Sequence, residues 1–189
     1  MNRRRALTAV SALTALAAGI GMSARAADRH WKRGPGGDLL LHTDGQDPGS
    51  GEVADILVKQ LRTALPDSGA TVVRESSAER LDSVMATARG DVAVIAYDIA
   101  LEMYRGEPPF KAAGPIELRV LVENYKYQVV CPADFARDRA YLLAEALMKD
   151  PVLLKLTVPD RPSGTTGRDS IPTHPGALAF LKGEPLDKK

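Results

Sequence analysis

The chain has 189 residues, with 25 basic and 24 acidic side chains and a formal net charge of +1. This balance excludes the strongly basic class of nucleic-acid-binding proteins, so we expect no nucleic-acid partner. Cys131 is the single cysteine, which excludes an intrachain disulfide. We expect Cys131 to pack as a small apolar residue within a strand.

The first 26 residues have the layout of a secretory signal peptide. Three arginines at positions 3–5 precede an uncharged apolar stretch over 6–20, and the sequence Ala24-Arg25-Ala26 offers a cleavage site. The sequence therefore predicts export to the periplasm, by either the general secretory or the twin-arginine route. Removing residues 1–26 leaves 21 basic against 24 acidic residues, a net charge of −3.

The rest of the chain is expected to form one domain. Residues 27–37 are polar with Gly and Pro, and are predicted to be a leader in which Trp31 covers the domain surface rather than stacking on a ligand. Residues 38–183 are predicted to form a single α/β lobe, and residues 184–189 a C-terminal tail.

Strand and helix patterns alternate through the predicted lobe. Apolar or β-branched runs predict strands over 38–42, 70–74, 91–96, 118–122 and 127–131. Helical spacing predicts helices over 53–65, 81–90 with Gly90 as the C-cap, 99–104 closed by Gly106, 137–149, a further turn from Asp150-Pro151, and a last helix from Pro175. The run over 91–96 is apolar on both faces, as in a strand covered by helices on both sides. The fold class expected is α/β, with a mostly parallel sheet and helices on both faces.

Ligands of such sheets bind beyond the carboxyl ends of the strands, where the strand order reverses. Residues 43–52, TDGQDPGSGE, are predicted to be a glycine-rich loop between the first strand and the first helix. The candidate ligand contacts are Thr43, Asp44, Gly45, Gln46, Ser50, Gly51, Tyr97 and Asp98. The alternatives are that residues 43–52 form an ordinary surface loop and that Asp98 is only a helix N-cap.

Catalytic and nucleotide motifs are missing from the sequence. The loop matches neither phosphate-binding glycine pattern, and His30, His42 and His174 form no H-E-x-x-H motif. Ser50 does not lie in a G-x-S-x-G elbow. We therefore expect a protein that is not an enzyme and has no metal or other cofactor, and we expect His174 to be an architectural cap.

Four segments in order resemble the solute-binding proteins of TRAP transporters, in the TAXI class. They are residues 77–85 (SAERLDSVM), 89–100 (RGDVAVIAYDIA), 118–125 (LRVLVENY) and 172–177 (PTHPGA). The last segment is similar to the family's P-x-H-P-G-A ending and is the most specific. The resemblance covers roughly residues 39–182.

The resemblance implies one lobe of a type II periplasmic binding protein. The chain departs from the family in two places. Family members have a second lobe inserted after the strand that resembles 127–131, and Pro132 here leads almost directly to the helix over 137–149. The family's Gly-Gly-Thr-Tyr signature in the first loop is replaced by Pro48-Gly49-Ser50-Gly51. A lone lobe leaves one side of a ligand in water, so we expect weak or no binding by the monomer.

Two functions follow from the resemblance. One is recognition of a small organic acid or amino-acid-like solute, or assistance to a TRAP-type transporter, without catalysis. The other is a periplasmic accessory or interaction protein that keeps the fold and has lost solute binding. The partners implied are a small solute, a membrane permease, a protein that supplies the second lobe, or a second copy in a homodimer.

Overall fold

The structure is a computed structural model of the whole chain, and it describes residue 31 and residues 37–87, 91–149, 154–162 and 168–186. The predicted signal peptide, most of the leader, His30, Gly90 and the turn predicted from Asp150-Pro151 lie outside the described residues.

The described elements follow the predicted α/β order. The strands are β1 (Leu40–Asp44), β2 (Thr71–Glu75), β3 (Val92–Ala96), β4 (Leu118–Glu123) and β5 (Tyr127–Pro132). The helices are α1 (Pro48–Ala64), α2 (Ala78–Ala86), α3 (Tyr97–Arg105), α4 (Arg137–Leu147) and α5 (Pro175–Leu181), with short 3-10 turns η1 (Pro66–Ser68) and η2 (Phe110–Ala112).

The five strands form one mixed sheet in the order β2-β1-β3-β5-β4. β1 pairs in parallel with β2 and β3, whereas β5 is antiparallel to β3 and to β4. Four of the five strands therefore point the same way, and β5 runs against them. The carboxyl ends of β1 to β4 and the first residue of β5 consequently meet at one edge of the sheet, which we call the carboxyl edge.

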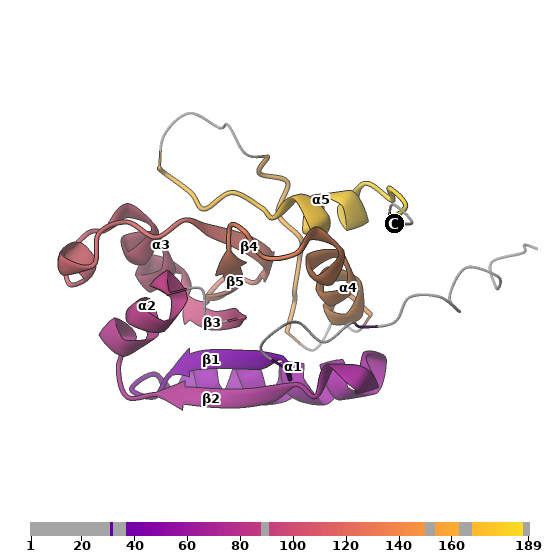
Figure 1. Cartoon of the computed structure of the whole chain (residues 1–189), viewed down its shortest axis with the longest axis horizontal. Helices are drawn as coiled ribbons and strands as arrows, with labels where there is room; N and C mark the ends of the chain where they lie inside the picture. The colour runs from indigo at the N-terminus through magenta and orange to yellow at the C-terminus, as the bar shows by residue number, and fades with distance from the viewer. Residues whose placement is uncertain (1–30, 32–36, 88–90, 150–153, 163–167, 187–189) are drawn as a thin grey trace, which may run out of the picture.

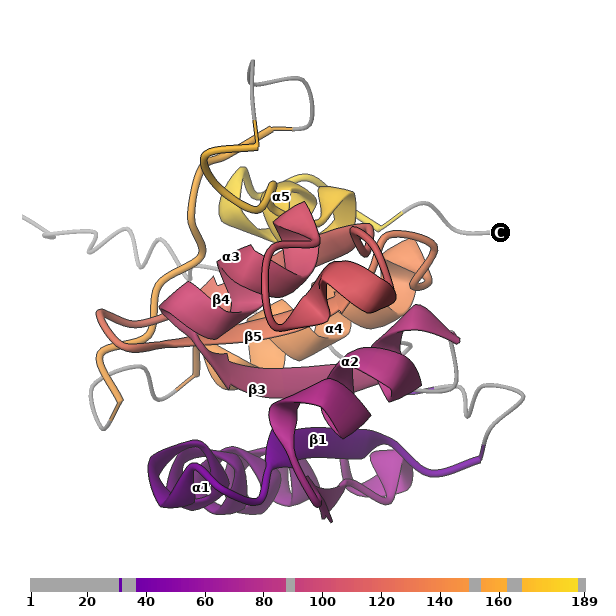
Figure 2. The same cartoon turned by 90° about the vertical axis from the view of Figure 1, so that its left-hand side faces the viewer.

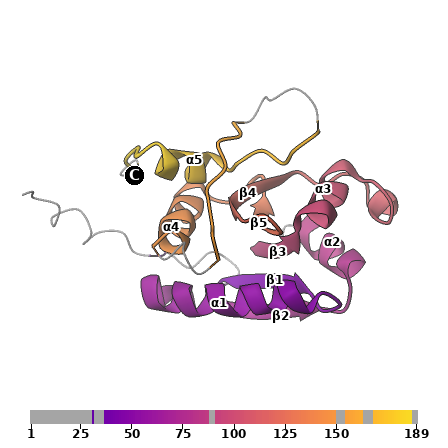
Figure 3. The ribbon, with the colours of Figure 1, turned by 180° about the vertical axis from the view of Figure 1, so that it is seen from behind.

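Helices cover both faces of the sheet, as the sequence predicts (Figures 1 and 2). One core, on the face of α1 and α4, contains residues such as Leu57, Val94 and Leu143. The other core, on the face of α2 and α3, contains residues such as Leu81, Ile95 and Met103. α1 runs alongside β1 and β2 (Figure 3). Every central strand is thus buried on both sides, which accounts for the continuous apolar run of β3.

The largest departure from the sequence prediction is at the start of α1. The predicted loop over 43–52 is short, because β1 extends to Asp44 and α1 begins at Pro48. The reason is local: Asp47 caps the helix by accepting from the Gly49 amide, and Pro48 occupies the first helical turn, where no N–H is needed. Ser50 and Gly51 therefore belong to the helix and not to a loop.

Other boundaries agree more closely. α3 ends at Gly106, whose φ of 68° is the left-handed C-cap that the sequence predicts. α2, however, has Thr87 as its C-cap, so it ends before the predicted position of Gly90. Cys131 is buried in β5 with no exposed surface, as expected of a small apolar residue, and burial raises the pKa of its thiol well above the usual value.

The C-terminal segment closes the outer edge of β4. Val120 donates its amide to the Pro172 carbonyl, and the His174 amide donates to the Val120 carbonyl. Thr157 forms a second bridge with Glu123. The chain thus returns to the sheet before α5, which packs mainly on α4.

Candidate functional site

The carboxyl edge holds every ligand contact that the sequence predicts. The chain leaves β1 toward β2 and later continues on the other side in β3, so the strand order reverses between β1 and β3. The end of β1 and the segment after it carry Thr43 to Gly51, and Tyr97 and Asp98 follow the end of β3.

The backbone amides of the β1–α1 segment are already used within the chain. Five of them donate to acceptors of the same molecule, at N···O distances of 2.8–3.4 Å: Gly45 to the Glu75 carbonyl, Gln46 to the Asp44 carboxylate, Asp47 to the Asp44 carbonyl, Gly49 to the Asp47 carboxylate and Gly51 to the Asp47 carbonyl. Recognition of a solute by these amides would first require these bonds to break, which costs free energy for each group left unpaired.

The predicted side-chain contacts in this segment are mostly turned inward. Thr43 and Ser50 have no exposed surface. The Ser50 hydroxyl donates to the Asp47 carbonyl at 2.9 Å. Gly45 and Gln46 are exposed, and the Gln46 side-chain amide donates to the Ser76 carbonyl at 3.2 Å. The structure therefore brings the predicted residues together but leaves few of them free to contact a ligand.

The N-terminus of α1 is occupied by its own carboxylate. The Tyr127 hydroxyl donates to Asp47 Oδ1 at 3.3 Å, in addition to the Gly49 amide at 3.1 Å. A Cβ at position 49 would lie 2.0 Å from the Tyr127 hydroxyl oxygen, so only glycine allows this approach. An anion would normally be favoured at such a helix end, but Asp47 already fills that place.

Tyr97 and Asp98 lie in the first turn of α3. The N-cap of α3 is Ala96, so the prediction that Asp98 is an N-cap is wrong. α3 begins two residues earlier than expected because the Tyr97 amide donates to the Lys126 carbonyl at 2.9 Å, which ends β3 against the β4–β5 hairpin. Asp98 is exposed in the first turn, where its negative charge is favoured by the helix dipole.

A hollow that the sequence did not predict lies next to this segment. It has a volume of about 240 Å³ and is lined by Val53, Asn124, Tyr125, Lys126, Tyr127, Leu154 and Lys155. Its lining carries two lysines and no carboxylate, with apolar walls from Val53 and Leu154. The sequence did contain one signal for this hollow, namely the aromatic residue Tyr125 in the short connection between β4 and β5.

The β4–β5 hairpin holds Tyr125 out into solvent. Tyr125 is 88% exposed, the most exposed of the large hydrophobic residues that the structure describes. Asn124 fixes the turn: its Oδ1 accepts from the amides of Lys126 and Tyr127 at 2.9 and 2.7 Å, and its Nδ2 donates to the Leu154 carbonyl at 3.2 Å. The aromatic ring is thus carried on a well-bonded turn.

The opposite edge of the sheet is closed by Trp31. The Trp31 side chain is 5% exposed, and the Arg139 guanidinium carbon lies 4.6 Å from its ring centroid and 4.8 Å from that of Phe135. Arg139 also reaches Asp91 Oδ1 at 3.3 Å. The prediction that Trp31 covers the domain surface is confirmed, and it does so far along the strands from the predicted ligand contacts.

The two histidines that the structure describes, His42 and His174, have structural partners. His174 caps α5: its Nδ1 accepts from the Gly176 amide at 3.0 Å, so Nε2 carries the proton and donates to the Phe135 carbonyl at 2.8 Å. Burial lowers the pKa of His174, which keeps the ring neutral. His42 Nδ1 lies 2.8 Å from Glu75 Oε1 on the α2 face. The prediction that His174 is an architectural cap is confirmed.

Within the described part of the chain, no three or more His, Cys, Asp or Glu side chains lie close enough together to hold a metal ion. Among the same residues, no helix has the length and apolar character needed to cross a bilayer.

Comparison with models of known protein families finds no match to this chain, and comparison with curated proteins finds none either. The resemblance to TAXI-class solute-binding proteins therefore continues to rest on the four sequence segments alone.

Proposed function

We propose that the chain is an exported, one-lobed protein of solute-binding type that works as an accessory protein, through contact of its carboxyl edge with another protein surface. It acts without catalysis. The observation that carries this proposal is the β1–α1 segment, where the amides and the helix end that would bind an anion are used by the chain itself. A protein that keeps the sheet and has lost solute binding accounts for that arrangement.

Two further features support contact with a protein. The concavity at the carboxyl edge is a hollow of about 240 Å³, smaller than the roughly 300–1,000 Å³ of typical ligand pockets. Beside it, the exposed ring of Tyr125 is the residue type that dominates binding energy at protein interfaces. The export step is supported by the layout of residues 1–26.

Solute binding is the second candidate, and one observation favours it. Lys126 and Lys155 line a hollow that has no carboxylate in its walls, which suits a small organic acid. In this alternative the acid lies against the hairpin and not on the β1–α1 segment. The lobe would then serve a TRAP-type permease, with the solute as cargo.

A thermal-shift screen with organic acids and amino acids separates the two candidates, because a ligand that binds only the folded state raises Tm. We expect no compound to raise Tm at millimolar concentration. Submicromolar affinity of the monomer for any small carboxylate, measured by calorimetry, contradicts the accessory function. Copurification with a multi-helix permease supports the accessory function when no solute is needed, and supports the transport alternative when it requires an added acid.

A further inference from the structure

We infer that the partner of the carboxyl edge is a second copy of this chain, bound through the hairpin and the hollow about a twofold axis. The inference rests on the proposed function, because it names the partner for the same face. A twofold interface uses one patch on both subunits, so the patch must be complementary to itself.

The first sign of self-complementarity is shape. The patch contains a projecting aromatic side chain, Tyr125, directly beside a hollow with apolar walls formed by Val53 and Leu154. In a twofold dimer the Tyr125 ring of each copy enters the hollow of the other. Asn124 holds the turn with three hydrogen bonds to backbone groups, so little backbone freedom of the hairpin is lost on association.

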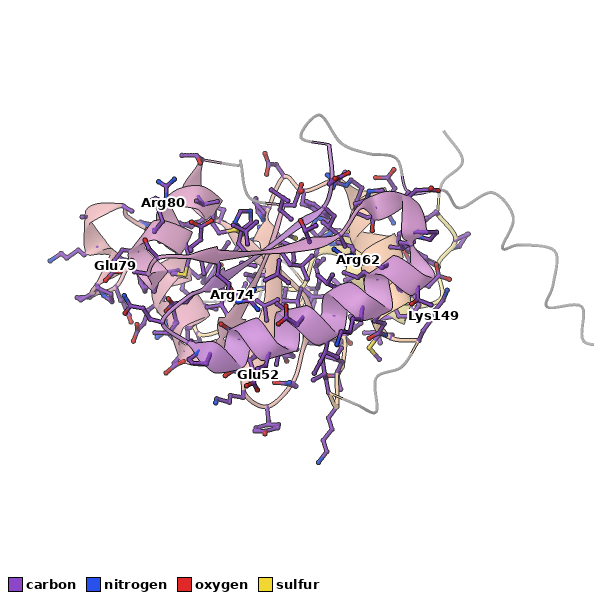
Figure 4. All side chains as sticks on the ribbon, turned by 90° about the horizontal axis from the view of Figure 1, so that it is seen from below. Glu52, Arg62, Arg74, Glu79, Arg80 and Lys149 are labelled. Atoms are coloured by element: carbon purple, nitrogen blue, oxygen red, sulfur yellow. The ribbon has the colours of Figure 1, made fainter. Side chains whose placement is uncertain are left out.

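The second sign is charge. Lys126 and Lys155 line the hollow, and Glu52, which precedes the lining residue Val53, is exposed on the N-terminal part of α1 (Figure 4). No ion pair joins Glu52 to either lysine within the described part of the chain. A patch that holds both signs side by side can pair with its own copy, with Lys126 of one subunit facing Glu52 of the other.

The third sign is the backbone of Lys155. Its φ of 51° makes it the single non-glycine residue of the described chain in the left-handed region. Such a conformation is unfavourable for a residue with a side chain and is held where the surroundings require it. Here it places Lys155 in the lining of the hollow, which adds positive charge to the patch.

The dimer is expected to be weak. A standard interface buries about 800 Å² on each partner, and this patch involves one hairpin, the start of α1 and two residues of the 154–162 segment. Association should therefore rise with protein concentration and weaken with added salt, because the Lys126–Glu52 contacts lie at the rim.

Sedimentation equilibrium of the purified protein, from micromolar to millimolar concentration, tests the inference with two charge-reversal variants. In Lys126→Glu every cross-subunit pair becomes Glu–Glu, and in Glu52→Lys every pair becomes Lys–Lys. We expect each variant alone to raise the dissociation constant at least tenfold. Mixing the two restores opposite charges at both contacts of the heterodimer, so the mixture should dimerise as well as the wild type. Arg80→Glu, an exposed charge reversal away from the patch, is the matched control and should change nothing.

The inference fails if the wild type stays monomeric over the whole range, or if a dimer persists in both charge variants and in Tyr125→Ala. It also fails if a carboxylate raises the Tm of a monomer and Lys126→Glu abolishes the rise, because a solute then occupies the hollow. That last result overturns the proposed function as well, whereas a monomer with no ligand response overturns the dimer alone. Tyr125→Phe should dimerise like the wild type, because the ring and its area are kept.

Discussion

Aromatic and charged side chains are enclosed at one end of the sheet and exposed at the other. At the end away from the carboxyl edge, Trp31 and Phe135 enclose the guanidinium of Arg139, which pairs with Asp91. At the carboxyl edge, Tyr125 is 88% exposed beside lysines that have no acidic neighbour in the lining of the hollow. The difference indicates that one end holds the fold together and the other is available for contact.

The closed end is also where the two ends of the lobe meet. Trp31 precedes β1, and His174, which precedes α5, donates to the Phe135 carbonyl and packs edge-on against the Phe135 ring at 6.2 Å. Arg139 thus packs on Trp31 from the start of the lobe, and Phe135, which Arg139 also contacts, packs on His174 from near its end. Substitutions here should change the free energy of unfolding, and substitutions at the open end should not.

Arg139→Ala should have the largest effect on stability. It removes the packing between two aromatic rings and leaves the Asp91 carboxylate, 22% exposed, without its cationic partner. We expect a loss of about 3 kcal/mol in the free energy of unfolding, measured by urea denaturation. Arg80→Ala is the control, because Arg80 lies 3.8 Å from Glu75 with 62% of its side chain exposed. A loss below about 0.5 kcal/mol for both variants would contradict the importance of the closed end.

Asp82 on α2 provides the next test, which concerns how stability depends on pH. This α2 residue is 2% exposed, its Oδ1 has no hydrogen-bond partner, and burial raises the pKa of its carboxyl to about 6. Because the folded-state pKa lies above the unfolded value, stability from this group is greatest below about pH 4 and is lost as pH rises through about 6.

Asp82→Asn should therefore stabilise the protein at pH 8, where the buried charge is removed. We expect a gain of about 2 kcal/mol, less than the full pKa shift implies because the asparagine still lacks a partner. Urea denaturation at pH 4 and pH 8 measures the difference. An equal change at both pH values would show that Asp82 ionises as freely in the fold as in the unfolded chain.

His174→Ala should cost less, about 1 kcal/mol at pH 8, because it removes one helix cap and one hydrogen bond to Phe135. The folded-state pKa is lowered, so the contribution of the neutral ring is present above the unfolded value of 6.5 and is lost as pH falls below it. The cost of the substitution should shrink between pH 7 and pH 5, opposite in sign to the Asp82 effect. His174→Asn, which keeps an N-cap acceptor, should recover part of the loss and remove its pH dependence.

The features that could be predicted from the sequence are those set by neighbouring residues, and the features that could not are set by residues distant in the chain. The strand and helix patterns, the Gly106 cap and the His174 cap depend on a few neighbouring residues, and their prediction is confirmed. The prediction of a ligand loop over 43–52 assumed that its glycines let the backbone approach a ligand closely. Gly49 is instead required by the Tyr127 hydroxyl, which comes from a strand 78 positions away, and no local pattern announces that contact.

The hollow was missed for the same reason. Its walls come from α1, the β4–β5 hairpin and the segment at Leu154, and they meet only after the sheet places β5 beside β3. The antiparallel direction of β5 relative to β4 does follow from their short connection, because parallel neighbours need a crossover of a dozen or more residues. The position of β5 between β3 and β4 does not follow from the sequence, because its buried apolar pattern is the same as that of the other strands. The predicted sheet was therefore right in class and mostly right in direction.

The smallest expected effect is at the open end. Tyr125→Ala should change the free energy of unfolding by less than about 0.5 kcal/mol at micromolar concentration, because an exposed ring buries little area in the monomer. Trp31→Ala is the matched aromatic deletion at the closed end, and it should cost several times more because that ring is 5% exposed. Urea denaturation of both variants at one low concentration compares the two ends directly. If Tyr125→Ala were as destabilising as Trp31→Ala, the hairpin would belong to the folded core, and its exposed ring could not be assigned to contact with another molecule.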